Sequence, residues 1–268
     1  MRPWLDTCRA AAADVVGVLA ALPTRLEREP VLRAGEGGDD TTAVDAAAEQ
    51  AVVARLEALH ERGVDFTLVS EELGERVYGE GGLWRVVVDP IDGSNNAKRG
   101  IPFFSLSIAV ADGPALADVV FGYVYDFGTG EEWTAERGRG AHLGGQPLGR
   151  VRPKDEIEIL SFEATTTAFV AERAQGMVGL AKRLRVMGSL ALSLCHLAAG
   201  RVDAVCSLKP ARSVDIAAAA LLVRECGLAI ELFDDPPFAE GLLDLGARSR
   251  VVAAGTPELC ERLAAALR

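Results

Sequence analysis

The sequence has few histidines and no closely paired cysteines. Its three histidines are scattered and none of its five cysteines forms a Cys-x-x-Cys pair, so a His/Cys zinc site has little support. An odd cysteine number in a long chain also argues against a secreted disulfide framework. We expect buried free thiols in a reducing cytosol, because most of the cysteines lie in apolar segments. The cysteines are Cys8, Cys195, Cys206, Cys226 and Cys260.

Runs of lysine or arginine are also missing, and acidic residues exceed basic ones. The chain has 39 Asp and Glu against 28 Lys and Arg, which gives a formal net charge of −11. Such a chain repels nucleic acids and anionic membrane surfaces, so we expect neither as a partner. It can still bind phosphates if divalent cations bridge the like charges.

No apolar run in the sequence reaches the length of a membrane-spanning helix. The apolar stretch Ala10–Leu22 has the composition of a signal peptide, but Asp6 and Asp14 interrupt the region. No small-residue cleavage site precedes Pro23. We therefore expect an amphipathic first helix over 5–22 that ends before the proline.

The length and composition fit a substantial core, since 49% of the 268 residues are hydrophobic. The sequence pattern of the first half of the chain predicts two helices followed by a largely antiparallel meander of strands. The second half alternates strands and helices, which is typical of a parallel or mixed sheet covered by helices. We expect an α/β fold in layers and one domain over 1–268 or, alternatively, two halves at 1–150 and 151–268.

Hydrophobic periodicity and turn residues define the individual elements. After the first helix, further helices are predicted at 42–60, 164–180, 190–199, 213–226 and 257–267. Strands are predicted at 66–69, 86–88, 103–110, 119–125, 131–135, 157–162, 184–187, 202–206, 228–232 and 251–254. Loops rich in glycine, acids or proline are predicted at 35–40, 138–147 and 234–250.

The most informative stretch is the turn after strand 86–88. The apolar strand stops at Asp89, Asp92 follows three residues later, and Gly93 and Ser94 come where a helix can begin. Two acids beside free backbone N–H groups suit a metal ion and a phosphate bound side by side. An ordinary turn explains the same residues, because Asp-Pro and Asp-Gly are common turn dipeptides.

Further acids stand at the ends of other predicted elements. Glu71 follows strand 66–69, Asp45 lies in the first turn of a helix, and Asp215 opens a strongly apolar helix. Carboxylates at element ends can reach a common cleft, and ligands that are all oxygen favour Mg²⁺ or Mn²⁺ over zinc. Each acid also has a simpler interpretation. Glu71 and Glu72 can be a solvated pair, and the two aspartates can stabilise helix N-termini by ~0.3–1 kcal/mol each.

Asp215 fits this simpler interpretation least well. A charge directly ahead of a largely apolar helix usually has a partner. If each acid is explained separately, there is also no reason for acids to recur at the ends of so many predicted elements.

These segments resemble the signatures of the inositol monophosphatase-like superfamily of metal-dependent phosphatases. The Glu-Glu pair at 71–72, the Asp-Pro-Ile-Asp-Gly-Ser-x-Asn motif at 89–96 and the Val-Asp-Ile-Ala-Ala motif at 214–218 match in order and approximate spacing. The segments 100–104 and 212–215 look closest to the archaeal-type branch. Its members hydrolyse inositol monophosphate, fructose 1,6-bisphosphate or both. The resemblance implies the αβαβα sandwich of the inositol monophosphatase/fructose-1,6-bisphosphatase type.

The resemblance also implies a set of metal ligands. Glu71, Asp89 and the carbonyl of Ile91 would hold one Mg²⁺, and Asp89 would bridge to a second Mg²⁺ shared with Asp92 and Asp215. A weaker third ion would lie near Glu71, and Mn²⁺ would substitute for Mg²⁺.

Catalytic and substrate-binding residues are implied in the same way. Asp45, Ser94 and Glu71 are the implied catalytic residues. Ser94 replaces the family's usual threonine and, with Asp45, would orient the attacking water. The implied substrate-binding residues are Gly93, Ser94, Asn96, Gly188, Ser189, Lys209 and Arg212.

Four positions depart from the family's pattern. Leu208 stands where inositol-specific relatives carry a glutamate for a ring hydroxyl, which puts a preference for inositol in doubt. Val214 replaces a tryptophan that many relatives have, and Asn95 and Ala97 are unusual neighbours for the motif.

We therefore predict a Mg²⁺-dependent phosphomonoesterase for a small sugar or polyol phosphate, working in the cytoplasm as a homodimer like its relatives. Two alternatives stay open. One is a phosphatase of the same fold for 3′-phosphoadenosine nucleotides or histidinol phosphate. The other is a non-catalytic relative that binds phosphorylated ligands.

Overall fold

The computed structural model of the protein describes residues 1–152, 154, 156–163 and 166–268. Positions 153 and 155 lie beside the predicted boundary after residue 150, and positions 164–165 would begin the predicted helix 164–180. All four positions lie outside the described residues. They flank β11 (Ile157–Glu163), a strand of the second of two large sheets.

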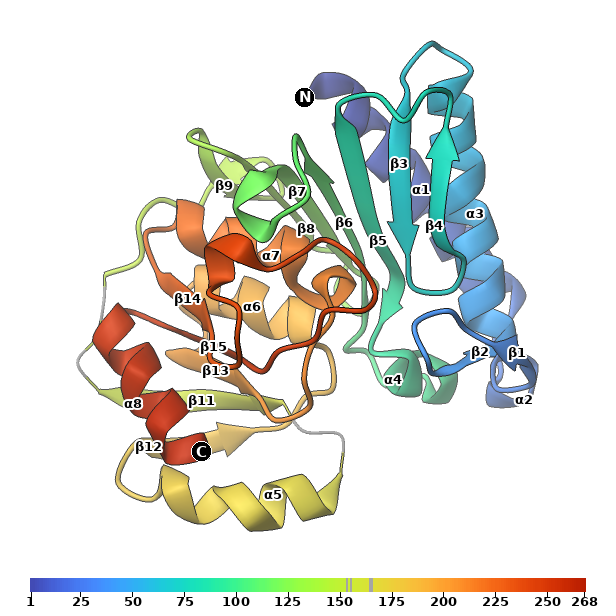
Figure 1. Cartoon of the computed structure of the whole chain (residues 1–268). Coiled ribbons are helices and arrows are strands. Elements are labelled where there is room, and N and C mark those ends of the chain that lie inside the picture. The colour runs from blue at the N-terminus through green and yellow to red at the C-terminus, as the bar shows by residue number, and fades with distance from the viewer. Residues whose placement is uncertain (153, 155, 164–165) are drawn as a thin grey trace.

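The strand that carries Asp89 and Asp92 lies inside an eight-stranded sheet (Figure 1). This strand, β5 (Trp84–Asp92), pairs in parallel with β3 (Phe66–Ser70) and antiparallel with β6 (Ser105–Ala111). A bulge between Asp89 and Asp92 interrupts the pairing with β6, so the chain leaves the regular sheet at that point. The order is β10-β9-β8-β7-β6-β5-β3-β4. The other strands are β4 (Gly74–Tyr78), β7 (Val119–Asp126), β8 (Glu132–Glu136), β9 (Gly140–Leu143) and β10 (Gln146–Pro147).

Two long helices cover one face of this sheet. They are α1 (Arg2–Ala21) and α3 (Ala43–His60), which pack on each other and on the sheet. Their apolar stripes bury Trp4 and Leu56 against sheet residues such as Phe66, as expected for amphipathic helices. Before α3 the chain makes α2 (Arg25–Arg28) and a two-stranded hairpin of β1 (Val31–Ala34) and β2 (Asp40–Thr42).

The second large sheet has five strands in the order β12-β11-β13-β15-β14. Its strands β12, β11 and β13 run in parallel, whereas β15 and β14 are antiparallel to their neighbours. The outer face is covered by α8 (Pro257–Leu267) and α5 (Thr167–Arg173), with a 3₁₀ turn, η2 (Ala174–Met177), beside α8. The strands are β12 (Ala181–Arg185), β13 (Ala204–Ser207), β14 (Ala229–Leu232) and β15 (Val251–Ala254).

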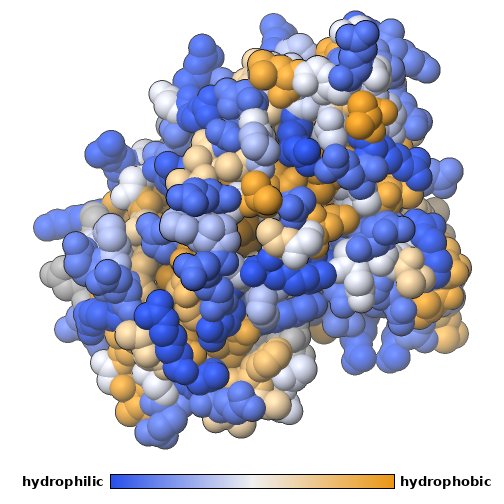
Figure 2. All heavy atoms as spheres, in the orientation of Figure 1, coloured by the Kyte–Doolittle hydropathy of each residue, from blue (hydrophilic) through white to orange (hydrophobic). Residues whose placement is uncertain are grey.

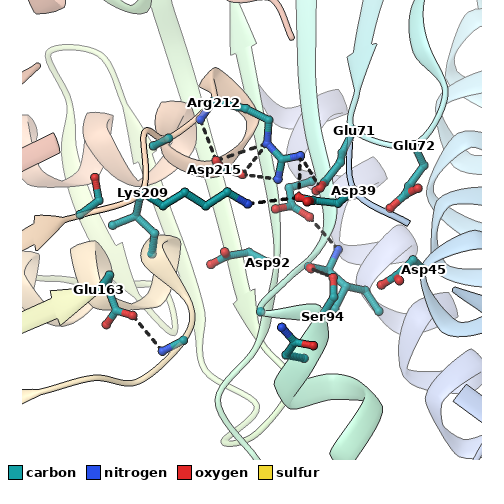
Figure 3. A pocket seen from close by; sticks show the side chains of 18 of the residues that line it. Asp39, Asp45, Glu71, Glu72, Asp92, Ser94, Glu163, Lys209, Arg212 and Asp215 are labelled. Atoms are coloured by element: carbon teal, nitrogen blue, oxygen red, sulfur yellow. Dashed lines mark hydrogen bonds and ion pairs between the residues drawn. The ribbon is translucent and has the colours of Figure 1, made fainter. Parts of the chain in front are cut away.

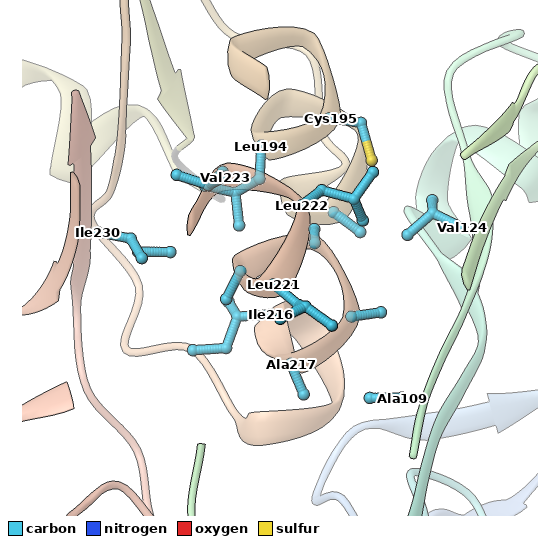
Figure 4. Close-up of a cluster of buried hydrophobic side chains, with 14 of the residues drawn as sticks. Ala109, Val124, Leu194, Cys195, Ile216, Ala217, Leu221, Leu222, Val223 and Ile230 are labelled. Carbon is cyan, nitrogen blue, oxygen red and sulfur yellow. The ribbon is translucent and has the colours of Figure 1, made fainter. Parts of the chain in front are cut away.

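A middle layer of two helices joins the sheets. These are α6 (Leu190–Ala198) and α7 (Ser213–Glu225), which contact strands of both sheets. Figure 4 shows Leu222 and Ile216 of α7 between Val124 of one sheet and Ile230 of the other. Because both faces of this layer are covered, α7 is apolar nearly all round, as its sequence predicted. The layers follow the predicted αβαβα order.

Several short elements of the structure were not predicted from the sequence. The predicted loop 138–147 contains β9 and β10, and β1, β2, β4 and α2 were not predicted. The helix start expected at Gly93 and Ser94 is the short helix α4 (Ser94–Arg99). The predicted helix 164–180 is only α5 with η2, and the strand expected at 184–187 is β12, which ends at Arg185. Two further 3₁₀ turns are η1 (Leu116–Asp118) and η3 (Phe238–Glu240). Strands such as β1 and β4 are largely exposed, so they lack the apolar alternation that reveals a strand.

The surface is mainly hydrophilic on the face shown in Figure 2, with apolar patches scattered between charged side chains. Among the described residues, no helix combines the length and apolar character needed to cross a bilayer. The five cysteines are all buried and free.

Candidate metal centre

Three acids from three elements meet at one point. Glu71 follows β3, Asp89 lies in β5, and Asp215 lies in the first turn of α7. One carboxylate oxygen from each lies within 4.8 Å of the others. The parallel strands β3 and β5 end at the same edge of the sheet, and α7 begins there, so its first turn faces the strand ends (Figure 3).

Asp92 lines the same cavity but also ties β5 to α6. Its Oδ2 accepts hydrogen bonds from the backbone N–H of Ala191, at 2.9 Å, and from the hydroxyl of Ser189. Ser189 is the N-cap of α6, and its hydroxyl oxygen also accepts from the N–H of Leu192. The carboxylate is therefore held in place by the start of the neighbouring helix.

The cavity around these acids has a volume of about 460 Å³. Its charged lining is strongly acidic, and the basic side chains Lys98, Lys209 and Arg212 stand among many carboxylates. The acidic lining residues are Asp39, Asp40, Asp45, Glu71, Glu72, Asp89, Asp92, Glu163 and Asp215.

Burial and mutual repulsion raise the pKa values of the central acids. Burial raises the pKa of Glu71 to about 8 and that of Asp92 to about 7. The negative charge of Asp215 also contributes to raising both pKa values. The pKa of Asp89 is raised as well, by burial first and by Glu71 and Asp92 next. Groups with such pKa values favour either protons or a nearby cation at neutral pH. A donor set of carboxylate oxygens fits a hard divalent cation such as Mg²⁺.

Asp215 was expected to have a partner, which the sequence did not identify, and Arg212 contacts it. Arg212 is the residue before α7, and its guanidinium lies 3.0 Å from Asp215 Oδ1 and 2.6 Å from Glu71 Oε1. The Arg212 side chain is also one of the residues that line the cavity.

Asp45 and Ser94 line the cavity on the side of α3 and α4. Asp45 Oδ2 accepts from the backbone N–H of Thr42, the N-cap of α3, at 3.1 Å. Its Oδ1 is buried and has no hydrogen-bond partner among the described residues. The hydroxyl of Ser94 donates to the carbonyl of Ile91 at 3.0 Å, and the N–H of Ile91 donates to Asp89 Oδ1. These bonds fix the turn that follows β5.

The predicted substrate-binding residues divide into two groups. Among the described residues, the cavity is lined by Gly93, Ser94, Gly188, Lys209 and Arg212, but not by Asn96 or Ser189. The amide of Asn96 donates to the carbonyls of Phe103 and Met187, both at 2.8 Å, so it braces the wall from behind. Leu208 is buried in the core of the second sheet rather than exposed to the cavity.

Several lining residues were not singled out from the sequence, among them Glu163, Asp39 and Lys98. Glu163 stands at the end of β11, and its carboxylate accepts from the N–H of Gly188 at 2.8 Å and the hydroxyl of Ser193 at 2.7 Å. Its position after a strand is the signal that revealed Glu71. Asp39 lies in the predicted acidic loop, and Lys98 lies in the helix after the Asp89 motif. Nothing in the local sequence separates these two from ordinary surface charges.

A family model described as the inositol monophosphatase family matches residues 4–268. The chain belongs to the inositol monophosphatase family. The match spans nearly the whole chain, so both large sheets and the acidic cavity belong to the family's domain.

Individual members of this family are also similar to the chain in sequence and in structure. The fructose-1,6-bisphosphatase/inositol-1-monophosphatase of Methanothermobacter thermautotrophicus is 32% identical over 97% of this chain and 95% of its own length. The protein of the same name from Archaeoglobus fulgidus is 33% identical over 97% of this chain and 98% of its own. A solved inositol monophosphatase–fructose 1,6-bisphosphatase superposes with a TM-score of 0.83 at 25% identity, covering 98% of this chain and 99% of the other. The predicted family and its layered fold are confirmed.

Proposed function

We propose that this inositol monophosphatase family member is a Mg²⁺-dependent phosphomonoesterase for a small sugar or polyol phosphate. Inositol monophosphate, fructose 1,6-bisphosphate or both are the expected substrates, because the curated relatives carry those names. The observation that carries the proposal is the meeting of Glu71, Asp89 and Asp215 within 4.8 Å, in a cavity that also contains Asp92.

The carboxylates of Glu71, Asp89, Asp92 and Asp215, with the Ile91 carbonyl, are the groups that would hold the ions. Bound Mg²⁺ lowers the pKa of water and neutralises charge on a phosphate, which is the chemistry that hydrolysis of a phosphate ester requires. No covalent intermediate on the protein is needed, because water can attack in line.

Asp45 and Ser94 are proposed to orient the attacking water. The Ser94 hydroxyl donates its hydrogen bond to the Ile91 carbonyl, so its oxygen is left to accept a hydrogen bond from water. Asp45 has a buried oxygen without a partner among the described residues, and that oxygen can accept a hydrogen bond from the other O–H of the same water. Glu71, which lies beside the proposed metal position, would act with them as a hydrogen-bond acceptor.

The substrate side of the cavity favours a sugar or polyol over a nucleotide. Lys209 and Arg212 supply positive charge for an anionic group, and the backbone of Gly93 and Gly188 lies at the wall. No aromatic side chain is among the described residues that line the cavity, so an adenine base would find no stacking surface there. Leu208 cannot bind an inositol hydroxyl, which favours a sugar phosphate within the proposed class.

Two further proposals concern the setting of the enzyme. The five buried free cysteines support work in a reducing compartment such as the cytoplasm. A homodimer is proposed from the resemblance to the family, and analytical ultracentrifugation tests it through the sedimenting mass.

Phosphate release from inositol 1-phosphate, fructose 1,6-bisphosphate and a 3′-phosphoadenosine nucleotide, with and without Mg²⁺, tests the function. We expect Mg²⁺-dependent release from the first or second substrate. The non-catalytic alternative predicts no turnover of any of them, and a preference for the nucleotide would replace our proposal with the other alternative.

The Asp92→Asn variant tests the site. It should lower kcat by roughly a hundredfold or more while the fold is kept, because it removes a charge that would hold the second ion. Asp6→Asn is the matched control, since Asp6 is exposed on α1. It should keep full activity. An Asp92→Asn protein as active as the wild type would show that the site is wrongly assigned.

A further inference from the structure

Arg212 contacts two of the acids that would bind the metal. Its Nη1 lies 2.6 Å from Glu71 Oε1, and its Nη2 lies 3.0 Å from Asp215 Oδ1. The backbone N–H of Arg212 also donates to Asp215 Oδ2 at 2.7 Å, so both oxygens of Asp215 are engaged by one residue. The Arg212 side chain is only 8% exposed, so water screens these contacts little.

A divalent cation at this point would use the same carboxylates. Glu71 and Asp215 are two of the three acids whose oxygens gather within 4.8 Å, and Asp89 is the third. A guanidinium hydrogen-bonded to these oxygens and a metal ion coordinated by them would be like charges a few ångströms apart in a poorly solvated site. Such a pair repels strongly.

We propose that Arg212 competes with the metal ion for Glu71 and Asp215, so that its guanidinium must leave these carboxylates when the ion binds. The inference rests on the proposed metal site and adds a role that the substrate-binding assignment of Arg212 does not contain. Arg212 weakens metal binding and keeps the acidic cluster neutralised when the ion is absent.

A further acid, Asp39, lies beside Arg212 and can pair with the guanidinium once it has left Glu71 and Asp215. Asp39 Oδ2 lies 3.6 Å from Arg212 Nη1 and 3.3 Å from Lys209 Nζ, on the loop between β1 and β2. Figure 3 shows Asp39 and Lys209 on the same side of the cavity as Arg212. A displaced guanidinium therefore stays at the cavity wall, near Asp39 and beside Lys209. There it can bind an anionic group of the substrate.

The loop that carries Gly37 blocks movement in the other direction. The N–H of Gly37 donates to the Glu71 carbonyl at 2.8 Å, and its own carbonyl accepts from Arg212 and from Arg248. A Cβ at position 37 would lie 2.6 Å from Arg212 Nη1. The glycine lets the loop backbone lie directly on the Arg212–Glu71 pair, so the guanidinium cannot leave toward the loop.

Binding of Mn²⁺ to the purified full-length protein, followed by the EPR signal of free Mn²⁺, tests the competition without any substrate. The Arg212→Gln variant should bind Mn²⁺ on the order of tenfold more tightly than the wild type, since it removes a competing charge. Arg248→Gln is the matched control. Arg248 donates to the same Gly37 carbonyl at 2.5 Å but pairs with none of the metal-binding acids among the described residues. Its Mn²⁺ affinity should stay within about twofold of the wild type.

The sign of the change decides the outcome. If Arg212 instead holds the carboxylates in their ligand positions, Arg212→Gln binds Mn²⁺ as weakly as the wild type or more weakly, and the competition is refuted while the metal site stands. A wild-type protein that binds no Mn²⁺ overturns the metal site and the competition together.

Arg212→Lys keeps the experiment decisive if the glutamine variant does not fold. Lysine retains the charge but lacks the planar fork that engages two carboxylates at once. Its Mn²⁺ affinity should exceed that of the wild type. Binding as weak as that of the wild type, or weaker, would again refute the competition.

Discussion

At the scale of single residues, the metal centre brings acids together at a free-energy cost that a cation can offset. Burial is the main cause of the raised pKa values of Glu71, Asp89 and Asp92, and neighbouring carboxylates add to it. Ionising a buried acid beside other acids is unfavourable unless positive charge lies close by. Arg212 supplies one such charge, and a divalent cation supplies two.

These pKa values predict how metal affinity depends on pH. Below about pH 7 the acids hold protons that a metal ion must displace, so affinity falls as pH falls through the pKa of about 8 for Glu71 and about 7 for Asp92. We expect Mn²⁺ binding to weaken by roughly tenfold or more between pH 8.5 and pH 6.5. EPR titrations at three pH values measure it, and equal affinities across this range would contradict the raised pKa values.

Some roles of single residues could be predicted from the sequence and others could not. Glu71, Asp89 and Asp215 each end or begin an element, a position that sequence patterns reveal. Asn96 stands in the same motif, yet its amide reaches Phe103 and Met187 behind the wall, because side-chain direction depends on tertiary packing. The contact of Arg212 with Glu71 joins residues far apart in the chain, which no local pattern can show.

At the scale of elements, the short helix α4 depends on glycines at both ends. Gly93 has φ +93° and Gly100 has φ +70°, a backbone region in which side chains are strained. An added Cβ at Gly93 would lie 3.0 Å from the Gly188 carbonyl oxygen and 3.2 Å from that of Phe103. At Gly100 it would meet nothing within 4 Å. The two positions share the strain but not the close contact.

Alanine substitution separates the two effects. Gly100→Ala should lose about 1 kcal/mol of unfolding free energy, from backbone strain alone. Gly93→Ala should lose about 2–4 kcal/mol and most of its activity, because the turn after β5 must move away from Gly188. Urea denaturation and kcat/KM measure both variants. Equal losses of stability would show that the close approach at Gly93 does not matter.

The predictability of elements follows their burial. The elements of the middle layer, such as α7, were predicted within a residue or two because their apolar runs are long. The exposed hairpin of β1 and β2 was not predicted, although its loop carries Asp39 and Gly37 over the site. Functional loops are held by contacts with other elements, so their own sequences specify them weakly.

At the scale of the whole molecule, the close packing of α7 on the first sheet sets the position of Asp215. Gly122 of β7 lies against α7, and an added Cβ there would lie 2.5 Å from the Ala218 carbonyl oxygen. The helix therefore rests on a strand position that has no side chain. The layered architecture was predictable from the family's motifs and from alternating strands and helices, but this packing distance was not.

Gly122→Ala should push α7 away from the sheet. Overpacking costs about 1–3 kcal/mol of unfolding free energy, and the shift of Asp215 should weaken Mn²⁺ binding as well. Gly17→Ala is the control, because a Cβ on that residue of α1 meets nothing within 4 Å. It should keep the metal affinity and gain up to about 1 kcal/mol from helix propensity. A Gly122→Ala protein with wild-type stability would contradict the tight packing.

The central claim is that folding gathers distant carboxylates into one site for divalent cations, and the anomalous scattering of Mn²⁺ in crystals of the protein tests it most directly. We predict anomalous peaks bounded by the carboxylates of Glu71, Asp89, Asp92 and Asp215, with the Arg212 guanidinium moved away from Glu71. Ordered Mn²⁺ elsewhere on the protein, with none among these four acids, would contradict the account.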